Sequence, residues 1–207
     1  MIGLQFIADT FQMEYKSVAE KIGVSKQTFQ DWIKERRKIP TQRLQQLSEL
    51  FGVNDVGLFQ KELTESEKLD VQMFYFQKTD NVEDVEVPRI GEDGKVYLAK
   101  GTISQNQNVI DFLSERSREV RLLEDVERSI TGQEPENEAN KKTLSNVLQV
   151  FDSSGQDKKT LDMVLFYLTE YQKEDYWGGM PSQFSKYADK GFFEKFKALL
   201  KESGLSE

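Results

Sequence analysis

The strongest constraint on the fold is a pair of short helical patterns in residues 15–37, separated by a single glycine. Apolar residues recur at helical spacing on both sides of Gly23: Val18, Ala19 and Ile22 before it, and Phe29, Trp32 and Ile33 after it. Gly23 can adopt the left-handed backbone that ends a helix and turns the chain sharply. Ser25 can cap the second helix by accepting a hydrogen bond from a backbone amide two or three residues on. Ala19 is small, which allows the two helices to cross closely before the turn.

The second helical pattern leaves polar and basic side chains on its outer face. Lys26, Gln27, Gln30 and Lys34 lie between its apolar positions, and these side-chain types read base edges and bind phosphates. Residues 26–43 carry 6 basic and 2 acidic side chains, whereas the whole chain carries 28 basic and 36 acidic ones. A solvated face of an ordinary helix would explain the spacing but not this charge distribution. A basic patch on an acidic protein indicates a surface that binds a polyanion.

Residues 1–62 resemble the Cro/repressor-like (Xre-type) family of helix-turn-helix DNA-binding domains. The resemblance rests on the motif above and on apolar residues that supply three further helices: Leu4, Phe6, Ile7 and Phe11 upstream, and Leu44, Leu47, Leu50, Phe51, Val56, Leu58 and Phe59 downstream. Tyr15 and Ile33 depart from the family pattern, because many members carry Gln and Glu at these positions. The resemblance implies a five-helix domain whose second motif helix enters the major groove of DNA.

The place of each residue on that helix implies its role. Lys26 and Gln27 at the start of the helix, and Gln30 one turn later, are the candidates for reading bases; Lys26 would favour guanine acceptors and Gln27 an adenine edge. The candidates for phosphate contacts are Thr28, Lys34, Arg36, Arg37 and Lys38. A single domain of this kind buries little surface. The expected partner is therefore double-stranded DNA, bound by a homodimer.

The rest of the chain predicts a β-hairpin and more helices. Residues 85–90 and 95–98 alternate apolar and polar side chains around the turn sequence Gly91-Glu92-Asp93-Gly94. A lone hairpin is marginally stable, so we expect it to pack on helices or to pair with a second copy. The fold class is thus mainly α. We expect three parts: a helix-turn-helix domain at 1–63, a connecting helix and linker at 64–84, and the hairpin with a helical oligomerisation or regulatory domain at 85–207.

A long helix is predicted over residues 105–130. Its apolar stripe consists of Ile110, Leu113, Val120, Leu123, Val126 and Ile130, with Ser117 in the gap. This stripe fits a dimerisation helix or an amphipathic helix packed within one chain. Further helices are expected at 141–151 and 158–171 and after a loop at 176–181. Their aromatic residues indicate a core, and the alternative is a ligand pocket lined by Phe166, Tyr167, Tyr171, Tyr176 and Trp177.

Composition argues against an enzyme. The chain has no Cys and no His, which removes the usual general base, thiolate metal ligands and the common nucleophile–base pairs. No Gly-rich phosphate loop or carboxylate calcium loop is present, so we predict no catalytic residue, metal or cofactor. A self-cleaving phage repressor is also disfavoured, because residues after Ser104 read as helical and Lys100 interrupts the Ala-Gly pair that such cleavage needs.

Charge and hydropathy complete the prediction. Residues 1–63 carry 9 basic and 8 acidic side chains, and the remainder carries 19 and 28. DNA would repel this acidic remainder, so we expect it to bind a protein effector rather than DNA. No apolar run approaches the ~20 residues that span a bilayer, and no secretory signal is visible, so we expect a cytoplasmic protein without a membrane partner.

The predicted function is a sequence-specific DNA-binding transcriptional regulator, a repressor of bacterial or phage type. The alternative is a protein-interaction factor, such as an antirepressor, an antitoxin, or a replication or conjugation accessory, that uses its DNA-binding domain as an anchor.

Overall fold

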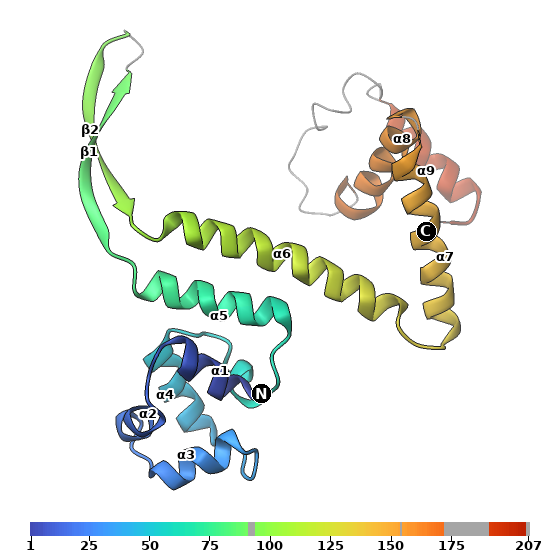
Figure 1. The fold of residues 1–207 in the computed structure, drawn as a ribbon. Coiled ribbons are helices and arrows are strands. Elements are labelled where there is room, and N and C mark those ends of the chain that lie inside the picture. The colour runs from blue at the N-terminus through green and yellow to red at the C-terminus, as the bar shows by residue number, and fades with distance from the viewer. Residues whose placement is uncertain (91–93, 154, 172–190, 206–207) are drawn as a thin grey trace. The chain divides into compact units, whose positions relative to one another are not determined.

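The computed structural model describes residues 1–90, 94–153, 155–171 and 191–205, and divides the chain into two compact units, 1–128 and 129–207 (Figure 1). The first unit contains α1 (Gly3–Thr10), α2 (Tyr15–Lys21), α3 (Lys26–Ile33), α4 (Thr41–Phe51), the 3₁₀ helix η1 (Val56–Gln60), α5 (Glu65–Lys78), β1 (Val82–Ile90), β2 (Val96–Ser104) and α6 (Gln107–Ile130), whose last turn crosses the boundary. The second contains α7 (Pro135–Asp152), α8 (Gly155–Phe166), the π-helix η2 (Tyr167–Tyr171) and α9 (Phe192–Glu202). The predicted class, mainly helical with one antiparallel hairpin, is confirmed.

The N-terminal helices enclose one apolar core. Its fully buried side chains come from α1, α2, α3, α4 and η1, and include Leu4, Ile7, Val18, Phe29, Leu47, Phe51 and Phe59. Each such burial stabilises the fold by roughly 1.5–3 kcal/mol. The chain closes on itself at Gly3, where an added Cβ would lie 1.8 Å from the carbonyl oxygen of Leu58, so only glycine fits. The five predicted helices are therefore present and share a single interior.

Helix α5 adds to this core. Val71 is fully buried within it, and Phe74 packs against it. The ring of Tyr75 meets that of Phe11 edge to face, with centroids 5.4 Å apart. Lys78 Nζ donates to the carbonyl oxygens of Glu49 and Leu50, at the C-terminal end of α4. Apolar burial therefore joins α5 to the five helices before it.

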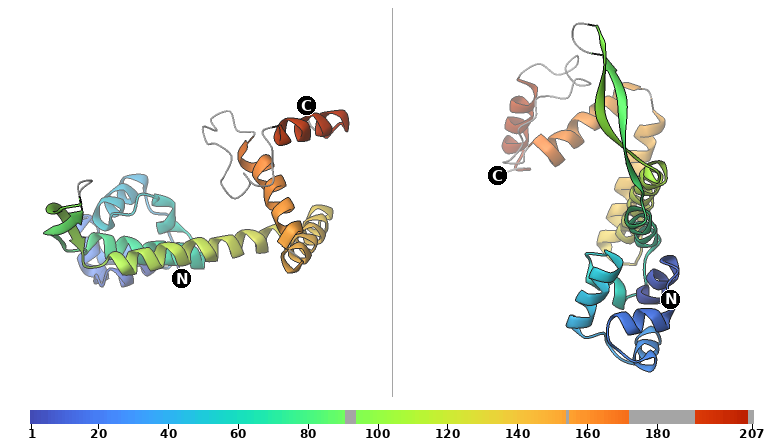
Figure 2. Two further views of the ribbon diagram at one scale, coloured as in Figure 1. Left: turned by 90° about the horizontal axis from the view of Figure 1, so that it is seen from above. Right: turned by 90° about the vertical axis from the view of Figure 1, so that its left-hand side faces the viewer.

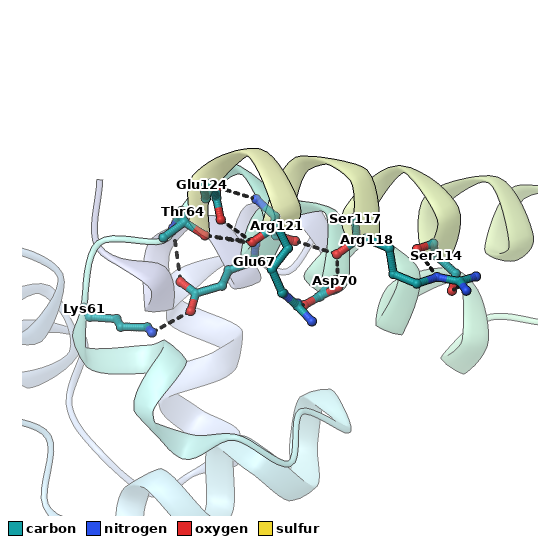
Figure 3. Close-up of polar contacts among 10 residues, drawn as sticks. Lys61, Thr64, Glu67, Asp70, Ser114, Ser117, Arg118, Arg121 and Glu124 are labelled. Carbon is teal, nitrogen blue, oxygen red and sulfur yellow. Dashed lines mark hydrogen bonds and ion pairs between the residues drawn. The ribbon is translucent and has the colours of Figure 1, made fainter. Parts of the chain in front are cut away.

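Polar contacts hold α6 against α5 (Figure 3). Glu124 accepts hydrogen bonds from the backbone amide of Ser66 at 3.0 Å and from its hydroxyl at 2.6 Å. Asp70 accepts one from Ser117 Oγ at 2.6 Å and pairs with Arg121. Because the first amides of a helix have no partner within it, Glu124 completes the cap of α5. Partial loss of solvent opposes ionisation of Glu124, but the hydrogen bonds from Ser66, together with contacts to Thr64 and the Glu65 backbone, outweigh it and lower the pKa of this carboxyl.

The stripe predicted for the long helix is divided in the structure. Of the residues of α6, only Leu113 and Ser117 are buried. Leu123, expected on the same stripe, is 63% exposed. The stripe therefore does not pack as one face within the chain, because Leu113 is buried and Leu123 is not. Its reading as a dimerisation helix stays a prediction.

The hairpin is longer than predicted. Val82 pairs with Ser104 and Ile90 with Val96 in a regular antiparallel register, and Figure 2 shows the twist of the two strands. The last residues of the predicted linker, from Val82 onward, therefore belong to β1, because residues 99–104 of β2 pair with their backbone. The base is fixed where α5 ends and α6 begins: Asn106 donates its amide to Asp80 Oδ1 at 3.0 Å and its Nδ2 to the carbonyl of Phe76 at 3.1 Å.

The second unit contains an aromatic cluster. α7 begins at Pro135 rather than near 141, since proline suits the first turn of a helix. Tyr167 is 1% exposed, and its ring stacks on that of Phe193 at 5.8 Å. Tyr171 lies 4.6 Å from the same Phe193 ring. These rings form a core, as the aromatic spacing favoured; Tyr176 and Trp177 of the alternative pocket lie outside the described residues.

None of the described helices combines the length and the apolar character that a membrane crossing requires.

The burial of Val71 predicts that α5 stabilises the DNA-binding domain. A fragment of residues 1–79 should be more stable than one of residues 1–63 by at least about 2 kcal/mol, since the burial of Val71 alone contributes about that amount. Val71→Ala in the longer fragment should remove a large part of the contribution of this side chain. Urea unfolding followed by circular dichroism measures both effects. Equal free energies of unfolding for the two fragments would show that α5 adds nothing.

The lowered pKa of Glu124 predicts a pH-dependent contact between α5 and α6. Since the folded pKa lies below the ordinary value of 4.5, the stabilisation is present above that pH and is lost as pH falls through the folded pKa. Glu124→Gln should abolish this component and weaken the contact by about 1 kcal/mol. Hydrogen exchange at the Ser66 amide, corrected for intrinsic pH dependence, reports the contact. The control Asp125→Asn, at an exposed neighbouring carboxylate, should behave as the parent; an unchanged pH profile in Glu124→Gln would refute the assignment.

Candidate DNA-binding interface

The turn between α2 and α3 has the geometry that the sequence predicts. Gly23 adopts a left-handed conformation with φ of 68°, and the amide of Val24 donates to the carbonyl of Ala19 at 2.9 Å. Ser25 then caps α3, because its Oγ accepts from the amide of Thr28 at 3.0 Å. These local bonds fix the direction in which α3 leaves the turn.

The inner face of α3 anchors the helix to the core. Phe29 is 0% and Trp32 3% exposed, and their rings meet edge to face at 6.1 Å. Ile33, one of the two departures from the family pattern, packs half-buried against the same core. The opposite face is left to solvent, with Lys26, Gln27 and Lys34 exposed.

The three predicted base-reading residues lie together on the first two turns of α3. Lys26 and Gln27 are exposed and Gln30 is half-buried. Gln27 Nε2 donates to Asp31 Oδ1 at 3.2 Å, and Arg36 Nη1 lies 3.5 Å from the same oxygen. Asp31 thus orients one predicted base-reading side chain and one predicted phosphate-binding side chain.

The predicted phosphate-binding residues divide into two groups. Thr28 is half-buried and its hydroxyl lies 2.9 Å from Ser25 Oγ, so it belongs to the helix cap. The basic residues follow at the end of α3 and in the loop after it, and all are exposed: Lys34, Arg36, Arg37 and Lys38. In the described part of the chain, no carboxylate lies within ion-pair distance of Lys26, Lys34, Arg37 or Lys38. These cations are therefore available to an external anion.

The structure adds residues that the sequence pattern did not single out. A surface hollow of about 570 Å³ joins Lys26 and Gln30 to Gln12 in the loop before α2 and to Lys16 in the first turn of α2. Gln12 has a φ of 53°, which turns the chain into α2. The place of Lys16 at the start of the second predicted helix could have indicated it as a DNA contact. Only the fold, however, brings Lys16 beside α3.

Tyr15, the other departure from the family pattern, has a structural role. Its ring centroid lies 5.8 Å from that of Phe29, and its hydroxyl donates to Asp9 Oδ1 at 2.9 Å. Burial and the contact with Asp9 raise the pKa of Tyr15.

Arg43 also has a structural role, since its Nη1 donates to the carbonyl of Ile22 and, at 2.7 Å, to Gln46 Oε1. The guanidinium of Arg43 keeps its charge, but these bonds hold it within the fold.

Comparison with known proteins agrees with this geometry. The sequence model of the helix-turn-helix family matches residues 12–58, which contain α2, α3 and α4. No curated protein and no solved structure shows significant similarity to the chain. The match supports DNA binding and transcription regulation by this part of the chain. By the match over residues 12–58, with which the turn glycine, the capped α3 and the exposed basic face agree, the N-terminal domain belongs to the Cro/repressor-like (Xre-type) helix-turn-helix family.

Proposed function

We propose that this protein is a sequence-specific transcription regulator, and a repressor of bacterial or phage type. The observation that carries the proposal is the outer face of α3, where exposed polar side chains lie beside cations that have no carboxylate partner in the described structure. Repression is the simplest outcome of such binding, because a protein that occupies a promoter excludes polymerase without making any further contact.

The residues of α3 supply sequence preference. Lys26 can donate to guanine O6 and N7, and Gln27 can bond an adenine edge through both atoms of its amide. Gln27 must release or share its bond to Asp31 to do so. Asp31 therefore holds the amide near its reading position in the free protein. Gln30, one turn later, extends the contact.

The basic residues after Trp32 supply affinity. Lys34, Arg37 and Lys38 can each neutralise a phosphate and release counterions, a term that is independent of sequence. Arg36 is partly engaged with Asp31 at 3.5 Å and contributes when that pair opens. Since one domain buries little DNA surface, the proposal includes a homodimer that binds two half-sites about one helical turn apart.

The remainder of the chain suits a protein partner. Residues 64–207 carry 19 basic and 28 acidic side chains, so DNA repels them on average. The hairpin tip exposes Ile90 by 75% and Val96 by 67%. This exposed apolar tip favours a second candidate function, a protein-interaction factor anchored on DNA. A full-length protein that selects no preferred DNA sequence would favour that candidate over the regulator.

Base reading can be tested by selecting binding sites from random DNA. Gln27→Ala and Lys26→Ala should change the preferred sequence, and each should cost about 1–3 kcal/mol on the parent's site. The matched control Lys68→Ala, at an α5 residue paired with Glu65, should leave both affinity and preference unaltered. If Gln27→Ala selects the same sites as the parent with equal affinity, the assignment of Gln27 fails.

Phosphate contacts predict a different pattern. Arg37→Ala should weaken binding to all sequences alike and should reduce the slope of log affinity against log salt by about 1. Titration of labelled duplexes at several salt concentrations measures that slope for a preferred and an unrelated sequence. A loss confined to the preferred sequence would assign Arg37 to base reading instead.

A further inference from the structure

Helix α6 presents a second, regular stripe on a face other than the one that meets α5. The stripe consists of positions separated by alternating steps of three and four residues: Val109, Phe112, Arg116, Glu119, Leu123 and Val126. This alternation is the spacing of a coiled-coil seam. Phe112 is 65% and Leu123 63% exposed, whereas Val126 is half-buried. Large apolar side chains therefore stand in solvent at seam positions.

The stripe is independent of the contact with α5. At 3.6 residues per turn, Leu113, Ser117 and Glu124 lie about a third of a turn away from it. Those three residues bind α5 or are buried. Helix α6 can therefore keep all its contacts with the DNA-binding domain while its seam positions accept a partner.

The middle of the stripe carries one charge of each sign. Arg116 Nη1 and Glu119 Oε2 are 2.8 Å apart, and their side chains are 51% and 56% exposed. An exposed pair of this kind adds little to the stability of the free chain. Its position between two apolar ends is the informative feature, because a charged pair inside a seam selects the register and direction of the partner helix.

We propose that two copies of the chain pair through α6 in antiparallel orientation. This deepens the homodimer of the proposed function, on which it rests, by naming the surface. A two-fold axis between positions 117 and 118 places Arg116 opposite Glu119 of the second copy. The same axis places Phe112 opposite Leu123 and Val109 opposite Val126. A single two-fold axis thus places each apolar seam residue opposite an apolar residue, and each charged seam residue opposite one of opposite charge.

The charges exclude the parallel arrangement of the same helices. A parallel two-fold pair in register would set Arg116 against Arg116 and Glu119 against Glu119, and like charges in a seam are destabilising. The antiparallel seam instead has apolar layers at both ends and two ion pairs in its centre. Self-complementarity, here of charges and of apolar positions, is what an interface between identical chains requires.

Charge exchange tests the register. Sedimentation of the full chain at tens of micromolar, without DNA, should show a dimer. Arg116→Glu and Glu119→Arg should each weaken dimerisation by about tenfold or more, because each sets like charges opposite one another. The double variant R116E/E119R should return the affinity to within about threefold of the parent. The control Arg118→Glu, an equal charge change on α6 outside the stripe, should have no effect.

Cysteine pairing tests the direction. The chain has no Cys of its own. Phe112→Cys and Leu123→Cys chains should form a disulfide-linked dimer when mixed, and neither should do so alone, because each residue faces the other position. Circular dichroism confirms that the variants remain helical. Self-linking of Leu123→Cys would show a parallel seam and would overturn the proposal.

The outcomes separate this inference from the proposed function. A parent protein that is monomeric at tens of micromolar, or a dimer that is indifferent to both charge reversals, overturns the α6 seam. Neither result affects the selection of DNA sites by Gln27 variants. Conversely, a chain that dimerises through α6 but binds no DNA would overturn the proposed function and leave the seam intact.

Discussion

The packing of Phe29 and Trp32 beneath α3 determines what the N-terminal domain can present to DNA. With these rings fixed in the core, the remaining positions of an eight-residue helix have no freedom to rotate about its axis. Ser25 fixes one end of the helix through its bond to Thr28. The outward direction of Lys26, Gln27 and Gln30 is therefore a consequence of apolar burial on the opposite face.

Two different kinds of force connect this domain to α5 and α6. Val71 joins α5 to the core by apolar burial, whereas α6 joins α5 through carboxylates and hydroxyls, chiefly Glu124 and Ser66. The first contact is indifferent to pH and salt in the ordinary range, and the second depends on ionisation. The DNA-binding face is therefore connected to the seam of α6 through two contacts in series. The contact of α5 with the core does not depend on pH, and the contact of α6 with α5 does.

Local patterns in the sequence were sufficient for the motif and insufficient for the rest of the fold. Gly23 and Ser25 act on neighbours within a few residues, so their roles could be predicted from spacing and residue type. The bond from Ser66 to Glu124 spans 58 residues, and no periodicity in either segment indicates it. Leu113 and Leu123 were equivalent in the sequence, whereas in the structure the first is buried and the second is exposed. Strand β1 was also not predictable in full from local sequence. Its first residues are acidic and resemble a linker, and they form a strand because β2 supplies their backbone partners.

The candidate DNA-binding site was also only partly predictable from the sequence. Exposure of Lys26 and Gln27 followed from the helical pattern, but two electrostatic details depended on the fold. Arg43 was counted with the basic patch, whereas its guanidinium binds the end of α2. Lys16 joins the face because the first turn of α2 lies beside α3, and the order of the residues in the chain does not indicate this proximity.

The polar character of the α5–α6 contact has a calorimetric consequence. The heat-capacity change of an unfolding step and its denaturant dependence both scale with the apolar surface that the step exposes. The contacts between α6 and α5 are hydrogen bonds and an ion pair, so separation of the two helices mainly hydrates groups that are already polar. The step would thus change the heat capacity little and shift little with urea. In a calorimetric scan its heat-capacity change would be far smaller than that of unfolding the apolar core of the N-terminal helices.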